Sequence, residues 1–282
     1  ITQMRFFIFL VSFYLILISF AQAAQPFKNK QLINAQTTVI PSGFEFNIQH
    51  RFGQVALNRS IYEDFLGFDG PANVRFSLAY RLNDRLYFGV GRTSFGKTID
   101  FEGKYLLFND EKSEFPLSIA LYSSVGIKTQ RFVANNNMYF SDSLTSFEHS
   151  FAHKLDYCTQ LIFSRSINDK VAINLSPTFV YKNLVKKGEK NLNVALPVSG
   201  KYQYSFGSSL LFEYAYCFGR RGGMFEHPLS LGFEFGTAGH VFQVFITNNQ
   251  SLRESNLYTT KGYDLSKTEF LLGFNIRRVW WF

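Results

Sequence analysis

Residues 44–52 read Phe-Glu-Phe-Asn-Ile-Gln-His-Arg-Phe, and residues 74–81 read Val-Arg-Phe-Ser-Leu-Ala-Tyr-Arg. In both stretches apolar side chains hold nearly every second position, and polar or small side chains hold the positions between them. A period of two is typical of a β-strand with one face in apolar and the other in polar surroundings. Each stretch is close to the length of about 9 to 11 residues that a tilted strand needs to cross a bilayer.

The same alternation recurs through most of the chain, so we predict about twelve strands in total, an even number as in bacterial outer-membrane barrels. The further strands are predicted at Leu86–Phe95, Ile99–Phe108, Leu117–Ile127, Leu155–Phe163, Val171–Tyr181, Val194–Tyr202, Phe206–Tyr216, Leu229–Phe235, Val241–Thr247 and Phe270–Phe282. The predicted fold class is all-β, a transmembrane antiparallel up-and-down β-barrel. Pro177 and Pro197 fit poorly, because a closed barrel has no free edge for a residue without an N–H donor.

The connections between these strands alternate between short and long, as they do in outer-membrane barrels. Short links rich in turn-forming residues include Asn83-Asp84 and Asn168-Asp169, whereas the links at Gln130–Ser150 and Asn248–Lys267 are long. The link at Ser94–Lys97 is short where a long one is expected, which predicts a shift of register there.

Composition excludes a helical membrane protein and argues against a nucleic-acid-binding role. Hydrophobic residues make up 46% of the chain, yet the mean hydropathy is −0.05, as expected when every second residue faces a polar interior. The net charge is +8, but the basic runs lie between apolar segments. In such loops the natural partners are outer-membrane lipids and the phosphates of lipopolysaccharide, and we expect no nucleic acid.

The two ends of the chain predict its destination. Arg5 precedes the uncharged run Phe6–Phe20 and then Ala21-Gln22-Ala23, which predicts a secretory signal peptide over residues 1–23, with residues 1–3 upstream of a start at Met4. Residues 24–42 are then expected to form a periplasmic or plug segment, and residues 43–282 the barrel in the cell outer membrane. Trp280 and Phe282 end the chain on aromatic side chains, a signal of the kind that the barrel assembly machinery recognises.

Four sequence blocks resemble a known family when they are taken in order. They are Gly43–Gly53, Asp64–Asp69, Arg85–Lys97 and Gly239–Asn248. Together they are similar to an uncharacterised outer-membrane β-barrel family of Bacteroidota, over most of the chain after the signal peptide. The resemblance implies the same barrel fold and location, and it supplies no catalytic or binding residues.

The sequence offers little support for metal, cofactor or enzyme chemistry. The five histidines are scattered without a metal-ligand spacing, and Cys158 and Cys217 lie in different, non-adjacent predicted strands, which disfavours a disulfide. We therefore expect no metal and no cofactor. His50 is placed on the outer face, where a lipid hydrolase would also need a serine and an orienting polar group. An interfacial histidine is the simpler interpretation.

The strongest candidate site is a set of charged side chains on the inward parity of the predicted strands. They are Glu45, Arg51, Arg75, Asp100, Glu102, Lys104, Asp156, Glu213, Glu234 and Arg277. Buried charges of opposite sign are expected to pair or to meet water. They would form either a salt-bridged plug across a narrow lumen or the lining of a small aqueous pore, and strand number does not decide between the two.

Three functions follow from these alternatives. The first is a narrow channel or uptake component for a small solute, with Gln130–Ser150 shaping its entrance. The second is a closed barrel scaffold whose outer loops or residues 25–42 dock a protein partner in a surface or secretion complex. The third is an outer-membrane lipid hydrolase that uses His50.

Overall fold

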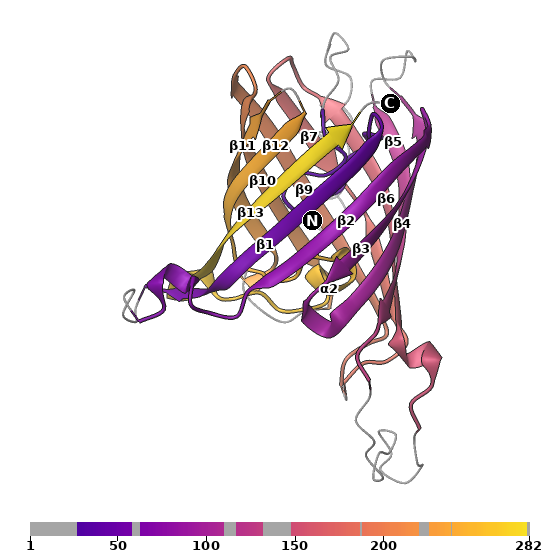
Figure 1. The fold of residues 1–282 in the computed structure, drawn as a ribbon, viewed down its shortest axis with the longest axis vertical. Coiled ribbons are helices and arrows are strands. Elements are labelled where there is room, and N and C mark those ends of the chain that lie inside the picture. The colour runs from indigo at the N-terminus through magenta and orange to yellow at the C-terminus, as the bar shows by residue number, and fades with distance from the viewer. Residues whose placement is uncertain are drawn as a thin grey trace, which may run out of the picture.

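The computed structural model describes residues 27–57, 63–109, 117–131, 148–186, 188–219, 226–237 and 239–280. Within them, antiparallel strands form one sheet that closes into a barrel (Figure 1). None of the helices in these parts of the protein is both long and apolar enough to cross a bilayer. The predicted signal peptide lies outside the described residues.

Thirteen strands are found in the described residues, and all but β7 and β8 pair with both of their neighbours along the sequence. They are β1 (Phe44–Ala56), β2 (Asn73–Asn83), β3 (Leu86–Thr93), β4 (Thr98–Phe108), β5 (Ser118–Lys128), β6 (Leu155–Ser166), β7 (Val171–Leu175), β8 (Thr178–Lys182), β9 (Leu192–Ser205), β10 (Ser208–Cys217), β11 (Leu229–Gly236), β12 (His240–Thr247) and β13 (Glu269–Trp280). Strand β13 returns to pair with β1, which leaves no free edge. An up-and-down barrel is therefore confirmed.

Strands β7 and β8 are two halves of one membrane-crossing strand. Both lie between β6 and β9. Leu175 at the end of β7 is opposite Val198, and Thr178 at the start of β8 is opposite Ala195, so both halves share one register with β9. The wall therefore has twelve strands, as predicted.

The interruption between β7 and β8 comes from Pro177, which cannot donate to the ladder. Its carbonyl still accepts a hydrogen bond from the Leu161 amide at 3.1 Å, and the Pro197 carbonyl accepts one from the Ser176 amide at 3.0 Å. The two prolines lie in adjacent strands at nearly the same height, so the missing donors fall in one short stretch and the barrel stays closed.

The wall is polar inside and apolar outside, the reverse of a soluble protein. In β2, Arg75 and Ser77 are 4% and 3% exposed, whereas the alternating Phe76 and Tyr80 are 48% and 55% exposed. Exposed apolar side chains over a closed sheet are stable in a lipid environment, where no backbone group is left unpaired. The alternation seen in the sequence thus separates side chains that face the lumen from side chains that face the membrane.

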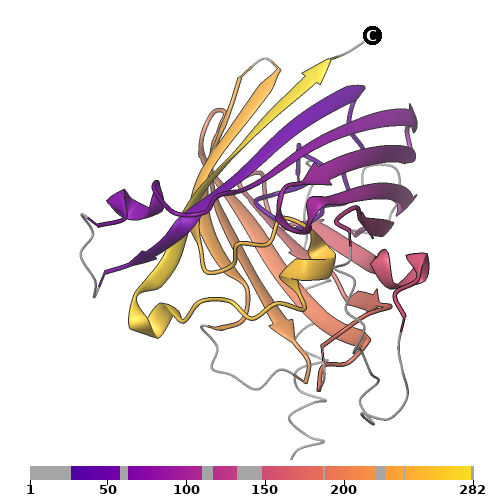
Figure 2. The same cartoon turned by 60° about the horizontal axis from the view of Figure 1, so that its bottom comes forward.

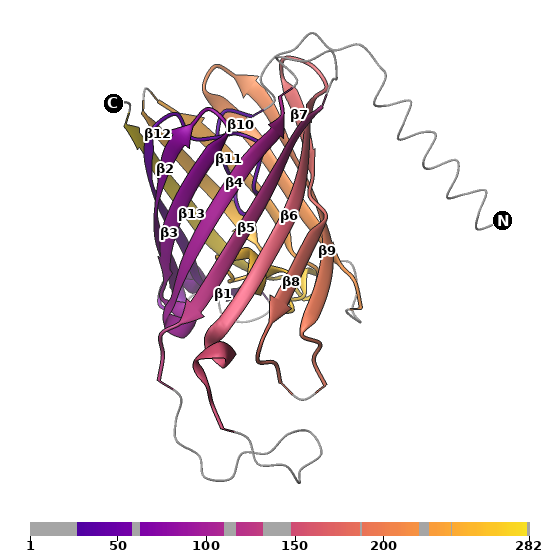
Figure 3. The ribbon, with the colours of Figure 1, turned by 90° about the vertical axis from the view of Figure 1, so that its right-hand side faces the viewer.

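The short connections and the long connections gather at opposite ends of the barrel (Figure 3). In outer-membrane barrels the end with short turns faces the periplasm, and here the start of β1 and the end of β13 lie at that end. The link after β3 is closed by η2 (Phe95–Lys97), with positive φ at Gly96 and Lys97. Thr93 stays opposite Thr98 without a register shift, so the predicted slip is wrong.

Two segments that are not part of the wall strands occupy the interior of the barrel. Residues 27–42 fold back into the lumen beneath the short turns (Figure 1). The connection between β12 and β13, residues 248–268, bends inward across the opposite end and carries α2 (Glu254–Leu257) (Figure 2). It was expected to be an outer loop, yet Leu252, Leu257 and Tyr258 are 5% exposed or less.

Candidate functional site

The N-terminal segment forms a small hairpin inside the barrel, and residues 30–37 are called the hairpin below. Gln31 and Gln36 form an antiparallel bridge, and the Leu32 amide donates to the Ala35 carbonyl at 2.9 Å. Ile33 at the turn is fully buried and belongs to an apolar cluster with Phe245 and neighbouring residues. The turn is therefore anchored by apolar contacts, although most of the hairpin is polar.

All ten charged residues that the sequence places on the inner face are buried in the structure. Their exposed fractions are 7% or less for Glu45, Arg51, Arg75, Asp100, Glu102, Lys104, Asp156, Glu213, Glu234 and Arg277. These side chains divide between the two segments that fill the lumen, with Arg75 between the two sets. Sequence parity could place them on one face, but it could not show what they hold.

Lys30 is the main cation that the hairpin brings into the lumen. Its Nζ lies 2.6 Å from Glu102 Oε1 and 3.9 Å from Glu45 Oε1. It also lies 5.1 Å from the centre of the Tyr87 ring. Lys104 donates from its Nζ to the Lys30 carbonyl at 2.9 Å. The ammonium group is thus surrounded by carboxylates and a ring, as a buried cation requires.

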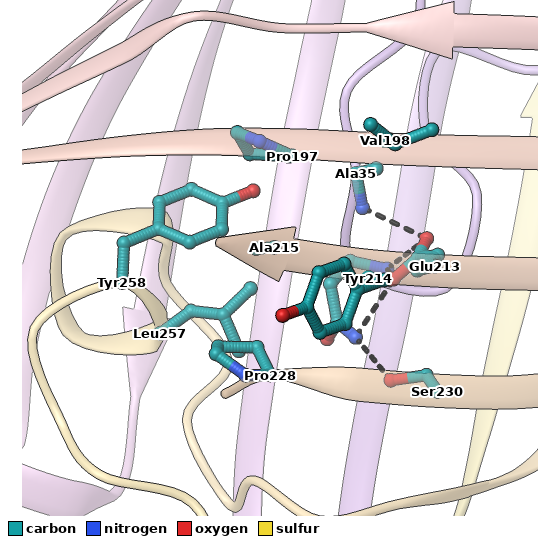
Figure 4. Close-up of a pocket in the computed structure, with 11 residues that line it drawn as sticks. Ala35, Pro197, Val198, Glu213, Tyr214, Ala215, Pro228, Ser230, Leu257 and Tyr258 are labelled. Carbon is teal, nitrogen blue, oxygen red and sulfur yellow. Dashed lines mark hydrogen bonds between the residues drawn. The ribbon is translucent and has the colours of Figure 1, made fainter. Parts of the chain in front are cut away.

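The turn of the hairpin is held by Glu213 of β10. Its carboxylate accepts hydrogen bonds from the backbone amides of Asn34 and Ala35, with 2.9 Å to each (Figure 4). Arg51 donates from Nη2 to Asn34 Oδ1 at 2.8 Å, and Arg277 donates to the Gln31 carbonyl at 2.9 Å. A cavity beside Glu213 has room for about one water molecule. The lumen is closely filled at this point.

Preceding the hairpin, Asn29 extends the polar contacts toward β11. Its Nδ2 donates to Glu234 Oε2 at 2.9 Å. Glu234 also pairs with Lys201, whose Nζ is 2.6 Å from Oε1. This carboxylate is therefore shared between the wall and the N-terminal segment.

Arg253 holds the opposite segment in place. This segment, residues 248–268, is called the lumenal loop below. The guanidinium of Arg253 contacts the Asp156 carboxylate at 3.1 and 2.5 Å, and its Nε lies 3.5 Å from Asp100 Oδ1. Burial alone would lower the pKa of Arg253, but Asp156 and then Asp100 raise it above its usual value. Arg253 therefore remains a cation and forms an ion pair that is almost fully buried.

Arg75 of β2 connects the two sets of charges. Its Nη2 is 2.5 Å from Asp100 Oδ2 and 3.3 Å from Glu102 Oε2. Asp100 contacts Arg253 of the lumenal loop, and Glu102 contacts Lys30 of the hairpin. One arginine of the wall thus stands between the carboxylates that hold each segment.

The hairpin and the lumenal loop also touch each other directly. Gln36 donates from Nε2 to Glu254 Oε1 at 2.8 Å, and the Tyr122 hydroxyl lies 3.3 Å from Glu254 Oε2. Burial, and then the nearby Glu102, raise the pKa of Glu254 above its ordinary value. The contact between the two segments therefore includes an acid that resists ionisation.

Leu257 and Tyr258 secure the far side of the lumenal loop. They pack against inner-wall residues that include Cys158 and Cys217, and these two cysteines are not joined in a disulfide. Sequence reasoning missed Leu257 and Tyr258, together with Arg253 and Glu254 of the same loop and Lys30 of the hairpin. The available signal was the presence of Leu252, Leu257 and Tyr258 in a connection expected to be solvated.

Glycines on the inner parity make room for the charged network. A Cβ on Gly91 would lie 2.5 Å from Arg75 Nη2, and one on Gly89 would lie 2.9 Å from Glu102 Cγ. A Cβ on Gly126 of β5 would collide with the guanidinium of Arg253. The Gly89-Val-Gly91 motif is thus a space-making feature of β3.

Two other sequence candidates, His50 and Trp280, lie on the outer parity of the wall, away from the lumen. His50 is stacked on Phe274 at 4.9 Å and is opposite Val74 on its other side, so neither cross-strand position supplies a serine. The described residues contain no cluster of His, Cys, Asp and Glu suited to a metal. Trp280 ends β13 and packs against Phe44 at 5.6 Å. Phe282, the other half of the predicted assembly signal, lies outside the described residues, as does most of the Gln130–Ser150 loop.

Comparison with solved structures places this geometry among outer-membrane barrels. The NanC porin aligns with a TM-score of 0.53 at 4% identity, over 83% of this chain and 99% of that one. The KdgM porin in complex with disordered oligogalacturonate aligns at 0.49 and 10% identity, over 84% and 99%. Outer membrane phospholipase A from Escherichia coli aligns at 0.45 and 12% identity, over 92% and 96%. At 4% identity, the likeness to the NanC porin shows a shared fold.

Sequence comparison agrees with the fold. No curated protein matches this sequence. A family model described as a membrane bound beta barrel domain matches residues 27–280, which include both segments inside the lumen as well as the wall. The chain therefore belongs to the membrane-bound β-barrel domain family DUF5777 and is an outer-membrane protein.

Proposed function

We propose that the protein is an outer-membrane channel for small solutes whose lumen is closed at rest by the hairpin and the lumenal loop. The observation that carries the proposal is the way in which the interior is filled. A narrow barrel can be sealed by the side chains of its own wall. Here two separate segments enter from opposite ends, and wall groups such as Glu213 and Asp156 bind them through polar contacts.

Removal of either segment would leave a wall suited to water. The side chains that hold the hairpin are charged or amide groups, as the contacts of Glu102, Arg277 and Asn275 show. Such a lining is costly in a dry core but is normal for an aqueous pore. A porin fold, as in the NanC porin, is consistent with this proposal.

The proposal is tested by conductance in planar bilayers. Ile33→Asp places an unpaired charge in the apolar cluster around the turn and should expel the hairpin. Arg253→Met removes the ion pair of the lumenal loop. The double variant should show discrete current steps, while the wild type and Ile33→Leu should stay closed for most of the time.

Folding of each variant is checked by its β-sheet circular dichroism and by resistance of the barrel to proteolysis. A correctly folded double variant without current steps would refute the channel. The alternative of a closed scaffold that docks a protein partner would then explain the sealed lumen better.

A further inference from the structure

The hairpin is held through its backbone as well as through the side chains of Lys30, Asn34 and Gln36. Four of its carbonyl groups accept hydrogen bonds from four different side chains of the wall: Lys30 from Lys104 at 2.9 Å, Gln31 from Arg277 at 2.9 Å, Ile33 from Asn275 at 3.0 Å and Gln36 from Asn174 at 2.9 Å. These donors lie on β4, β13 and β7, so they surround the hairpin. Every peptide of similar shape carries the same carbonyl groups, whatever its sequence.

The amide groups of the hairpin are recognised in the same way. The Asn34 and Ala35 amides both donate to Glu213, and Ala35 is seen beside this carboxylate in Figure 4. The wall thus offers acceptors to backbone N–H groups and donors to backbone carbonyl groups. A wall that served only an acidic or only a basic solute would not need both.

Further buried polar atoms on the inner parity of β1 and β2 have no hydrogen-bond partner among the described residues. They are both side-chain polar atoms of Asn47, Nε2 of Gln49 and Oγ of Ser77. Asn47 and Ser77 are opposite each other on β1 and β2, and each residue is 3% exposed or less. These amide and hydroxyl groups can bind more peptide backbone than the hairpin itself supplies.

One apolar subsite of the wall fits an aliphatic side chain. Ile33 lies against Phe245 and Leu211, and a Cβ on Gly232 would come within 3.1 Å of Ile33 Cδ1. The absence of a side chain at Gly232 therefore shapes a space for an aliphatic group at the turn.

From these contacts we infer that the lumen is a binding site for oligopeptides, which replace the hairpin by making the same backbone hydrogen bonds. The inference rests on the proposed channel, because it identifies the class of solute that enters it. The preferred ligand is a short peptide that can form a turn with an aliphatic residue within it.

Binding is measured with the Ile33→Asp/Arg253→Met protein in detergent, by anisotropy of fluorescent peptides. The first probe is a synthetic peptide with the sequence of residues 29–37, and the second is a turn peptide of unrelated sequence with an aliphatic residue at the turn. The third is the first peptide N-methylated at the positions of Asn34 and Ala35, which removes the two backbone donors to Glu213 and leaves only the side-chain donor Asn34 Nδ2. Oligogalacturonate serves as an unlabelled competitor of acidic sugar chemistry.

The inference predicts that the first two peptides bind and that N-methylation weakens binding at least tenfold. Glu213→Gln should reduce this difference, because the carboxylate is the acceptor of both amides. Equal binding of the methylated peptide, failure of the unrelated peptide to bind, or displacement by oligogalacturonate at lower concentration than by peptide would overturn it. Because the assay measures binding without current, a protein that binds peptides but never conducts would refute the channel alone.

Discussion

Replacing Arg253 with Met should release the lumenal loop while the barrel wall stays folded. Arg253 and Asp156 are 3% and 2% exposed, and their charged groups are in direct contact. Removing one partner of a buried pair leaves the other charge unpaired, at a cost of about 3 to 5 kcal/mol. This cost destabilises the docked position of the loop and not the barrel wall, because Arg253 takes no part in the hydrogen-bond ladders between the wall strands.

At about 1.4 kcal/mol for each factor of ten, the undocked population should rise by roughly two to three and a half orders of magnitude. Chymotrypsin cleavage after Tyr258 reports this population, because Tyr258 is 3% exposed in the docked loop. When opening is fast relative to cleavage, the cleavage rate follows the open fraction. The site of cleavage is identified by mass spectrometry.

The matched control is Lys261→Met in the same loop. Lys261 pairs with Glu226 at 2.7 Å, but its side chain is 60% exposed, so the loss should be about 0 to 1 kcal/mol. A cleavage rate of Arg253→Met within a few-fold of the control would show that the loop is not held by this ion pair. The contacts of the lumenal loop would then no longer support the proposed closure of the channel.

Three further predictions concern the same two segments. Gly126→Ala should speed cleavage after Tyr258 because its Cβ would displace the Arg253 guanidinium, whereas Gly200→Ala, whose nearest atom would be 3.5 Å away, should not; equal rates would contradict the packing. The docked loop should hold the Glu254 proton more tightly than the released loop, since burial and Glu102 raise its pKa. This stabilisation of docking should therefore be complete below the ordinary pKa of a glutamate and be lost as pH rises through the raised pKa, and Glu254→Gln, compared at each pH, should lose this dependence. Lys30→Met should speed amide exchange in residues 30–37 by leaving Glu102 with less positive charge, and Lys30→Met/Glu102→Gln should recover part of the loss; additive effects would exclude direct coupling.

The wall of the barrel could be predicted from sequence because its physics is local. In β2 the alternation of Arg75 and Ser77 with Phe76 and Tyr80 is set by which side faces lipid. The same parity placed the ten charged residues on the inner face. Each of these inferences needs only neighbours in the sequence.

The contents of the lumen could not be predicted, because they depend on partners far apart in sequence. Glu213 binds an amide 179 residues away at Asn34, and Arg253 binds Asp156 97 residues away. A charge pattern shows that partners are needed but not which segment supplies them. The interruption at Pro177 was also ambiguous, since only the common register of β7 and β8 shows that one strand continues through it.

Amide hydrogen exchange of the N-terminal segment in lipid nanodiscs tests the central claim most directly. If the hairpin occupies the lumen at rest, peptides covering residues 30–37 should exchange orders of magnitude more slowly than an unstructured peptide, because the Leu32, Asn34, Ala35 and Thr37 amides are all hydrogen-bonded in the interior. Complete exchange of these residues within seconds, alongside protected wall strands, would mean that the hairpin lies outside the lumen and that the channel is not closed in this way.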